Sequence, residues 1–307
     1  MQIGFVIIGI ILIIILWTAI EQKQLVVTKY KVTSKKLPKA FQDTRLVILA
    51  DLHNYSFGRE NERLLKKIEE QKPDYILIAG DMINKKVVSY PSNAFYLLEK
   101  LAKSYRIYYA YGNHEQRMEK LLQEGQVKTS DVKQKKAANL AALCSTWVQY
   151  KNLLKDIGVT FLDNEATYLQ RNHQKVKITG VSIGKEFFVK GKLPYMAKSY
   201  LNELLGEAKT MDFQILLAHN PLYFQNYADW GADLTISGHL HGGLVRLPGI
   251  GGVVSPQVRF FPKYNAGNFI NNGQEMVVSR GLGSHSMMPR LFNIPEIVLI
   301  TMENGEL

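Results

Sequence analysis

The chain has 307 residues, of which 46% are hydrophobic and 21% are charged, and its formal net charge is +11. This length and hydrophobic content are ample for a large folded core, and they exclude an intrinsically disordered chain. Because Cys144 is the only cysteine, no intrachain disulfide can form.

The N-terminal segment has the character of a membrane anchor. Residues 3–20 are eighteen residues without a charge, about the minimum length that spans the hydrocarbon layer of a bilayer. A cleaved signal peptide is the alternative, but no Lys or Arg comes before the run, and Trp17-Thr18-Ala19 is a poor cleavage site. We therefore expect a transmembrane anchor over residues 1–22, a single-pass location in the cell membrane, and the lipid bilayer as a partner.

A basic connection follows the anchor over residues 23–40. By the positive-inside rule its lysines place the rest of the chain in the cytoplasm, although charge is the only evidence and the extracytoplasmic side stays open. Residues 25–33 alternate in polarity like an edge strand, so the solvated face of a strand is a second interpretation of the same charge. Only Glu21 opposes these lysines, which are Lys23, Lys29, Lys31, Lys35, Lys36 and Lys39.

From residue 41 to the C-terminus, strand-like and helix-like segments alternate, which predicts an α/β domain. We expect two packed sheets with outer helices, a helical insertion over about residues 115–157, and a loop rich in Gly, Pro and aromatic residues over 247–269. The expected helices are 61–71, 91–103 and 196–208. The expected strands are 45–50, 75–79, 106–111, 159–162, 166–170, 176–183, 213–218, 233–237, 276–279 and 296–302.

Polar segments follow five of these strands and hold five of the seven histidines. Side chains at the carboxyl ends of neighbouring strands converge on one crevice of an α/β sheet. Mixed oxygen and imidazole ligands suit Mn, Fe, Zn or Co better than Ca, and we expect two divalent cations, Mn²⁺ first. The segments are Asp51-Leu52-His53, Gly80-Asp81, Gly112-Asn113-His114, His219, and Gly238-His239-Leu240-His241-Gly242-Gly243.

The spacing of these residues suggests how they share two metals. Asp51 and His53 stand two residues apart, which on a strand puts both on one face, and Asp81 could bridge two cations. Two metals roughly 3.5–4 Å apart can hold a bridging hydroxide and clamp the attacking and leaving oxygens at phosphorus. His114 is then available to act as the general acid, and Glu115 is a candidate orienting residue. The further ligands offered are Asn113, His219, His239 and His241.

These motifs resemble those of the calcineurin-like metallophosphoesterase superfamily, and more closely its membrane-anchored bacterial branch. The resemblance runs from about residue 25 to the C-terminus, through segments such as Arg280-Gly281-Leu282-Gly283. It implies a four-layer α/β/β/α sandwich preceded by one transmembrane helix, a binuclear centre, and hydrolysis of phosphodiesters, phosphomonoesters or pyrophosphates. It assigns Asp51, His53, Asp81 and His241 to one metal, and Asp81, Asn113, His219 and His239 to the other.

The resemblance also bears on the substrate. The superfamily includes enzymes that cleave the pyrophosphate of UDP-2,3-diacylglucosamine, which makes a lipid-linked or nucleotide-linked phosphate a candidate by analogy. The chain departs from the family pattern at Asn84, where an acid is frequent, and at Leu244, where Gln is common. Neither position is a metal ligand, so the departures bear on substrate contacts and not on the centre.

Several interpretations stay open. Asn54 and Arg246 are candidate substrate contacts, with surface pairing as the alternative for Arg246. Six aromatic residues could form an apolar lip for an acyl chain, although ordinary packing is the stronger interpretation. His173 is expected in a turn and His285 in solvent. The six aromatic residues are Phe187, Phe188, Tyr195, Phe260, Phe261 and Tyr264.

Two other function classes compete with a phosphoesterase. A catalytically silent protein could keep the pocket to bind a phosphorylated ligand, but such a protein has no use for His114 as an acid. A nuclease of the same superfamily is the second alternative. No basic stripe interleaved with aromatic residues and no nucleic-acid fold signature is present, so we expect no nucleic-acid partner. The sequence gives no indication of the oligomeric state.

Overall fold

Two six-stranded mixed sheets pack face to face in the computed structural model, which describes residues 2–84, 91–125, 134–208, 211–284 and 290–306. In the first sheet β14 runs antiparallel to β2, and every other pair of neighbours is parallel. The spatial order of this sheet is β1 (Val26–Ser34), β14 (Glu296–Asn304), β2 (Arg45–Leu49), β3 (Tyr75–Ala79), β4 (Arg106–Ala110) and β5 (Thr160–Leu162).

The second sheet has four parallel central strands and an antiparallel strand at each edge. A separate two-stranded hairpin is formed by β10 (Val245–Leu247) and β11 (Gly251–Val254). The order of the second sheet is β12 (Gly267–Asn271), β13 (Gln274–Val278), β9 (Leu234–Ser237), β8 (Gln214–Ala218), β7 (Gln174–Val181) and β6 (Glu165–Arg171).

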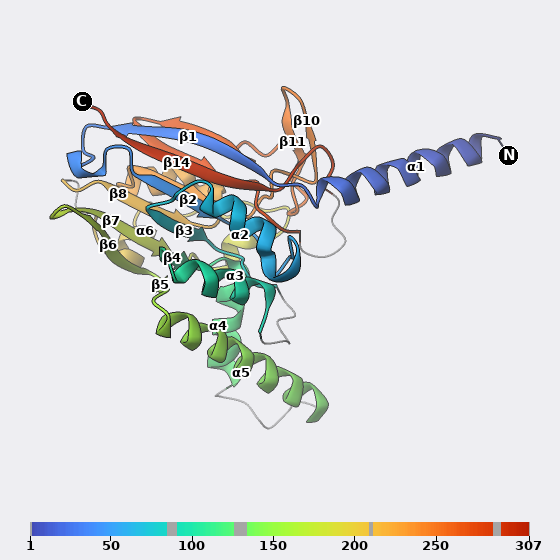
Figure 1. The fold of residues 1–307 in the computed structure, drawn as a ribbon, viewed down its shortest axis with the longest axis horizontal. Coiled ribbons are helices and arrows are strands. Elements are labelled where there is room, and N and C mark those ends of the chain that lie inside the picture. Colours follow the sequence, from blue (N-terminus) through green and yellow to red (C-terminus); the bar gives the residue numbers. More distant parts are fainter. Residues whose placement is uncertain (1, 85–90, 126–133, 209–210, 285–289, 307) are drawn as a thin grey trace.

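Hydrophobic cores hold the layers together. Side chains such as Ile48, Leu77 and Ile215 fill the space between the two sheets. A second core lies between the first sheet and α2 (Glu62–Glu69), α3 (Asn93–Ala102) and α5 (Gln134–Asp156). A third lies between the second sheet and α6 (Tyr200–Leu205) and α7 (Phe224–Trp230). The predicted α/β/β/α order of layers is therefore confirmed (Figure 1).

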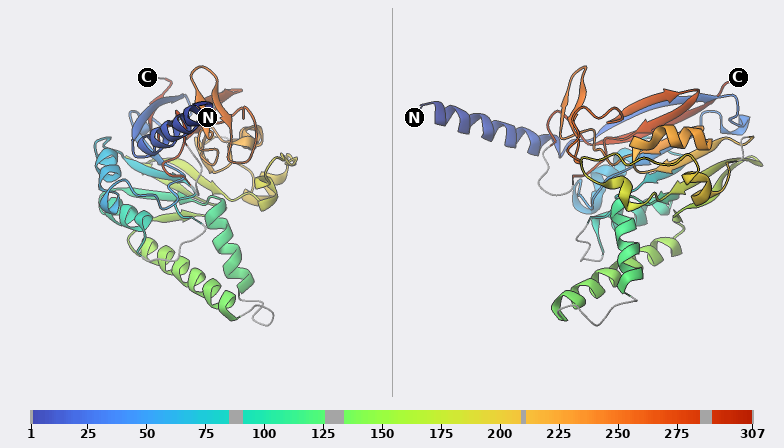
Figure 2. Two further views of the ribbon diagram at one scale, coloured as in Figure 1. Left: turned by 90° about the vertical axis from the view of Figure 1, so that its right-hand side faces the viewer. Right: turned by 180° about the vertical axis from the view of Figure 1, so that it is seen from behind.

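The predicted helical insertion consists of two helices that project from the sandwich, α4 (Asn113–Gly125) and α5 (Figure 2). α4 begins two residues earlier than predicted, so Asn113 and His114 lie in its first turn. The helix predicted over 196–208 is reduced to α6, which begins four residues later and ends where Gly206 takes a left-handed φ of 74°. The loop predicted over 247–269 contains β11 and the start of β12. Short 3₁₀ turns are η1 (Lys39–Phe41), η2 (Arg59–Asn61), η3 (Lys185–Phe188) and η4 (Pro221–Tyr223).

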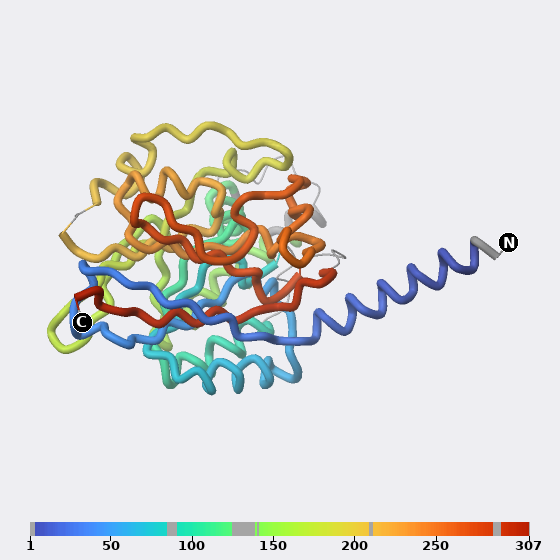
Figure 3. The backbone as a smooth tube through the Cα atoms, turned by 90° about the horizontal axis from the view of Figure 1, so that it is seen from above, coloured from blue at the N-terminus to red at the C-terminus, as the bar shows by residue number. Residues whose placement is uncertain are grey.

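The N-terminal helix α1 (Gln2–Glu21) extends away from the sandwich (Figure 3). By length and composition it could cross a membrane or serve as a signal sequence, and only 11% of its segment Gly4–Glu21 is buried, unlike a core helix. The predicted strand after it is present as β1, where Lys29 and Lys31 are exposed and Lys31 pairs with Glu303 at 2.6 Å. Part of the basic charge is thus the solvated face of an edge strand.

Candidate metal centre

The five predicted segments meet at one end of the sandwich. Three segments begin just after β2, β3 and β4, which run parallel in the first sheet. The other two begin just after β8 and β9, which run parallel in the second sheet. Asp51, His53, Asp81, His114, His219 and His241 are buried, whereas Asn113 and His239 are half-buried. The opening to solvent therefore lies on the side of Asn113 and His239.

Most of these side chains do not project from strands. Asp51, His53, Asp81, His239 and His241 all have left-handed backbone conformations, with φ between 48° and 71°. The expectation that strand alternation places Asp51 and His53 on one face is therefore wrong. Both residues lie in a turn beyond β2, where their N–H groups donate to the carbonyl oxygens of Gly80 and Asp81, each at 3.0 Å. Asp and His tolerate this conformation better than branched residues do.

Glycine is required where two of the motifs approach each other. A Cβ at Gly80 would lie 2.4 Å from the backbone nitrogen of Gly112, and Gly80 has a φ of +88°. The loops after β3 and β4 could not come this close with any side chain between them. This contact brings Asp81 beside Asn113 and His114.

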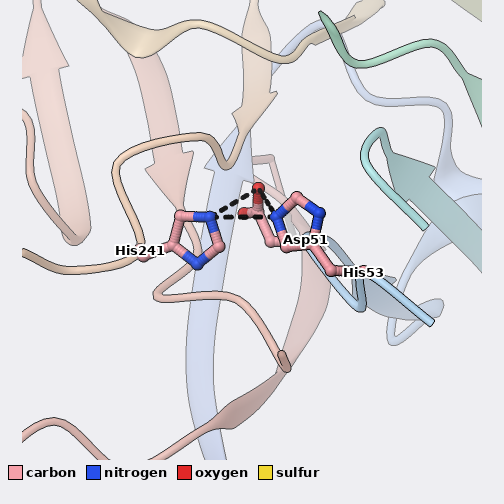
Figure 4. Close-up of side chains that lie close together, drawn as sticks. All are labelled: Asp51, His53 and His241. Carbon is pink, nitrogen blue, oxygen red and sulfur yellow. Dashed lines mark hydrogen bonds and ion pairs between the residues drawn. The ribbon is translucent and has the colours of Figure 1, made fainter. Parts of the chain in front are cut away.

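One cluster is formed by Asp51, His53 and His241 (Figure 4). Nε2 of His241 lies 3.5 Å from Oδ1 of Asp51, and Nε2 of His53 lies 3.9 Å from the same oxygen. The two Nε2 atoms face each other at 3.1 Å. Two imidazole nitrogens and one carboxylate oxygen thus converge on a single point.

Asp81 belongs to two further clusters. With His53 and His114 it forms one, in which both Nε2 atoms lie 3.9 Å from Oδ2 of Asp81. With His219 and His239 it forms the other, in which Nε2 of His219 lies 3.2 Å from the same oxygen. One carboxylate oxygen therefore belongs to two sets of candidate ligands.

The protonation pattern fits divalent cations. Nδ1 of His219 lies 2.6 Å from the carbonyl oxygen of Ala79, and Nδ1 of His53 lies 3.3 Å from that of Ile83. A carbonyl only accepts, so each Nδ1 carries a proton, and each Nε2 faces the carboxylates and can present them a lone pair once it gives up its own proton. Lone pairs and carboxylates repel each other unless a cation or a proton lies between them. The side-chain oxygen of Asn113 is buried with no hydrogen-bond partner among the described residues, which suits a further ligand.

The electrostatics show how strongly this cluster attracts positive charge. Burial lowers the pKa of His219, but the carboxylates of Asp81 and Asp51 outweigh it and raise the pKa to about 10. Burial, opposed by the charge of His219, raises the pKa of the Asp51 carboxyl to about 7. The chemistry of the donor set thus matches a divalent metal site.

Glu115 lies behind the ligands and connects two of their loops. Its carboxylate accepts hydrogen bonds from the N–H groups of Asp81 (2.9 Å), Met82 (3.0 Å), Ile83 (3.2 Å) and Gly112 (3.0 Å). A fifth comes from the hydroxyl of Tyr109 at 2.7 Å. Burial, and then the charge of Asp81, raise the pKa of Glu115 to about 7. Its contacts match the orienting role expected of it.

The candidate substrate contacts have structural partners. The side-chain oxygen of Asn54 accepts from the N–H of Ala94 at the start of α3, at 3.0 Å. Arg246 donates to the carbonyl oxygen of Gly242 at 2.8 Å and to the side chain of Asn265 at 2.7 Å. His173 lies in the turn between β6 and β7, as predicted, and His285 lies outside the described residues.

Two residues near the centre carry no signal in the sequence. The amide nitrogen of Gln257 lies 2.6 Å from Nε2 of His239. The side-chain nitrogen of Asn293 donates to the carbonyl oxygens of His241 and Gly243, each at 2.6 Å. Both belong to irregular segments that come close to the histidines only in the folded chain. Position within a motif could not have found them.

Comparison with known proteins agrees with this geometry. Residues 44–243 match the model of the family described as calcineurin-like phosphoesterase. The chain belongs to this family. It is a metal-dependent phosphoester hydrolase, and its clustered His and Asp residues are suited to binding divalent metal.

Related phosphoesterases match most of the chain. An uncharacterised metallophosphoesterase of Bacillus subtilis (strain 168), YkuE, is 25% identical over 93% of this chain and 88% of its own length. The phosphodiesterase YaeI of Escherichia coli (strain K12) is 26% identical over 84% of this chain and 82% of its own. Among solved structures, a 5′-nucleotidase precursor from Thermus thermophilus aligns with a TM-score of 0.44 and 15% identity, over 85% of this chain and 56% of its own.

Proposed function

We propose that this phosphoesterase is binuclear, is anchored by α1, and hydrolyses phosphodiester, phosphomonoester or pyrophosphate bonds. The observation that carries the proposal is the position of Asp81, whose carboxylate is shared by two clusters of ligands. A carboxylate that belongs to two sets of imidazole ligands is suited to bridge two cations. Mn²⁺ is the first candidate, with Fe, Zn and Co as alternatives.

The residues divide between two sites. Asp51, His53 and His241 would hold one cation together with Asp81. Asn113, His219 and His239 would hold the other, also with Asp81. Two bound cations would activate a water molecule and stabilise the negative charge that develops at phosphorus. Because the carboxylates are buried, solvent would screen the charge of bound cations only weakly.

His114 is the proposed general acid. It lies in the first turn of α4, and its backbone N–H donates to Oδ1 of Asp81 at 2.8 Å, which fixes the imidazole beside the centre. Its Nε2 lies 3.9 Å from Oδ2 of Asp81, close enough to reach a leaving group at the same centre. Proton transfer to a departing alkoxide typically contributes about 10²- to 10⁴-fold in rate.

A phosphodiester is the first substrate class to test. The name of the E. coli relative, a phosphodiesterase, supports this choice. A lipid-linked or UDP-sugar-type pyrophosphate, such as UDP-2,3-diacylglucosamine, is the finer candidate and rests on analogy with the superfamily.

Hydrolysis of bis-p-nitrophenyl phosphate by the full chain in detergent tests the proposal. The chain is stripped with a chelator and assayed before and after Mn²⁺ is added, beside Asp81→Asn. An exposed carboxylate on α7, changed in Asp229→Asn, is the matched control. We expect turnover that requires the metal, that Asp81→Asn loses, and that Asp229→Asn keeps.

The opposite results point to the other function classes. A folded chain that binds Mn²⁺ but turns over no phosphoester would favour the silent ligand-binding protein. Faster cleavage of single-stranded DNA than of the small diester would favour a nuclease.

A further inference from the structure

The sheet topology puts the end of α1 and the metal centre at the same end of the sandwich. β1 begins at Val26, opposite Glu296 at the start of β14. β14 runs antiparallel to β2, where Val298 pairs with Ile48, three residues before Asp51. Neighbouring strands lie about 4.8 Å apart, so the start of β1 is only roughly 10 Å to the side of the end of β2. Whatever α1 is inserted into must lie close to the centre.

The last turn of α1 is fixed to the domain at this end. The ring of Trp17 packs against that of Phe292, with centroids 6.1 Å apart. The N–H of Phe292 donates to the carboxylate of Glu21 at 2.6 Å, and Glu21 is buried. The neighbouring residue Leu291 is hydrogen-bonded to β10, because its carbonyl oxygen accepts from the N–H of Arg246 at 3.0 Å. The helix therefore leaves the domain beside the β10–β11 hairpin (Figures 1 and 3).

Large apolar side chains are exposed around this hairpin. The exposed fractions reach 72% for Phe260, 62% for Phe261 and 61% for Val258. Exposed apolar side chains that gather in one region of a surface mark a contact with a protein or a membrane. We call this group the apolar rim, and its members are Leu247, Ile250, Val258, Phe260, Phe261 and Phe292.

The backbone of the rim is strained. Val258 has a φ of 60°, Phe261 of 46° and Phe292 of 55°. This left-handed region is unfavourable for a β-branched or aromatic residue, and Asn or Gly would relieve it. Strain combined with exposed apolar side chains indicates a function for the segment other than stability.

The rim is continuous with the mouth of the metal centre. Gln257, which contacts His239, comes directly before Val258 in the chain. Val254 of β11 forms a bridge with Phe260, so the hairpin and the loop are one unit. A cavity of about 570 Å³ beside them is lined by Leu247, Ile250 and Phe292 of the rim and by the cations of Arg246 and Lys263. Apolar walls with nearby cations match the acyl chains and phosphates at a bilayer surface.

We propose that the apolar rim inserts into the headgroup region of the bilayer that α1 crosses, and so turns the mouth of the metal centre toward phosphate groups of lipids in that leaflet. From the proposed function, this inference takes only the role of α1 as a membrane anchor; it does not depend on hydrolysis. Trp17, near the end of α1, would then lie at the interface where Trp is enriched in membrane proteins.

The depth of a fluorescent label tests this contact in the full chain. A Cys144→Ser background allows one NBD label at Phe260→Cys, and a control label at His173→Cys, an exposed turn residue between β6 and β7. Because β7 runs parallel to β8, that turn lies at the end of the sheet away from the centre. The chain is reconstituted into phosphatidylcholine vesicles with some phosphatidylglycerol and with a nitroxide-bearing lipid as the quencher.

We expect the label at position 260 to be blue-shifted and quenched several-fold more than the label at 173. Equal, water-like emission from both labels, in a chain that resists carbonate extraction, would overturn the inference alone. A chain that carbonate extracts from the vesicles would overturn the anchor and the inference together. A Val258→Ser/Phe261→Ser variant removes two neighbours of the label and should reduce its quenching at least twofold. Unchanged quenching would overturn the inference, because the label would then enter the bilayer without help from Val258 and Phe261.

The label experiment needs no turnover, so it separates this inference from the proposed function. A chain that hydrolyses the soluble diester while the label at 260 stays in water loses the inference alone. A chain whose label is quenched but which hydrolyses nothing loses the proposed function alone.

Discussion

Nε2 of His219 lies 3.2 Å from Oδ2 of Asp81, while its other ring nitrogen is held 2.6 Å from the carbonyl oxygen of Ala79. The backbone carbonyl thus holds the proton on Nδ1, and Nε2 of His219 points at a buried carboxylate. This arrangement is stable only with positive charge between the two groups. It makes His219 the best ligand at which to test one metal site separately.

His219→Ala should lower turnover of the soluble diester by at least about 100-fold, because even outer partners of metal ligands are worth about 10- to 100-fold. Calorimetric titration with Mn²⁺ should show one bound equivalent fewer than in the parent chain. His173→Ala, at a distant exposed turn, is the control and should change neither quantity. Unaltered metal binding in His219→Ala would remove this residue from the ligand set.

Glu115→Gln should destabilise the chain without changing the size of the side chain. In the variant an amide NH₂ group would replace one carboxylate oxygen. Backbone N–H groups that donate to that oxygen in the parent chain would then face another donor. Lost bonds to a charged group and donors left unpaired correspond to about 2–3 kcal/mol in the free energy of unfolding. Tyr109→Phe, which removes one of the five bonds, should cost about 1 kcal/mol.

Urea unfolding of the metal-free chains measures both changes at Glu115. The metal-free state is the relevant one, because bound metal would mask part of the loss. A loss for Glu115→Gln no larger than that for Tyr109→Phe would show that the backbone bonds to Glu115 contribute little.

Gly80→Ala tests the close approach of the two ligand loops. The new methyl group would lie 2.4 Å from the backbone of Gly112. The combined strain of the clash and of the left-handed φ should be about 3 kcal/mol or more. Gly158→Ala is a matched control, because Gly158 has a φ of +96° and nothing within 4 Å of its Cβ position.

Gly158→Ala should therefore lose only about 1–2 kcal/mol, from the backbone conformation alone. Thermal unfolding and metal-dependent turnover of the two variants separate the contributions. Equal effects of the two substitutions would show that the contact between Gly80 and Gly112 is unimportant.

Alkylation of Cys144 should be slow at neutral pH and should accelerate as the pH rises above 9. Burial raises the pKa of this thiol from 9.0, so the reactive thiolate is scarcer in the folded chain than in the unfolded one. The rate with iodoacetamide, measured across pH in the folded chain and in urea, checks this expectation. A folded chain that reacts faster than the unfolded one at pH 8 would contradict it.

Much of the framework could be predicted because buried strands are visible in the sequence as apolar runs. β3 was predicted with its observed bounds, and the polar segments after β2, β3, β4, β8 and β9 do meet at one end of the sandwich. The expectation that strand alternation pairs Asp51 with His53 is wrong, since local turns with positive φ direct these side chains. Such turns leave no periodic signal in a sequence.

The remaining features depend on contacts between distant segments. α7 and the β10–β11 hairpin were not predicted, and the hairpin lies inside a stretch dominated by Gly, Pro and aromatic residues. Gln257 reaches His239, and Asn293 reaches the carbonyl oxygen of His241, only after the chain folds. Residue type gives no warning of either contact. Phe260 and Phe261 are candidates for an apolar lip in the sequence, and the stronger expectation that they pack is wrong, since both are exposed. A sequence does not distinguish an aromatic residue that packs from one that faces solvent.

Electron paramagnetic resonance of the Mn²⁺-loaded chain tests the central claim, a pair of metals bridged by Asp81, most directly. We predict two Mn²⁺ per chain and a spin-coupled multiline signal, which Asp81→Asn should convert to the six-line signal of isolated Mn²⁺ while Asp229→Asn retains it. A six-line signal from one Mn²⁺ in the parent chain, or a coupled signal that survives Asp81→Asn, would contradict the bridged centre.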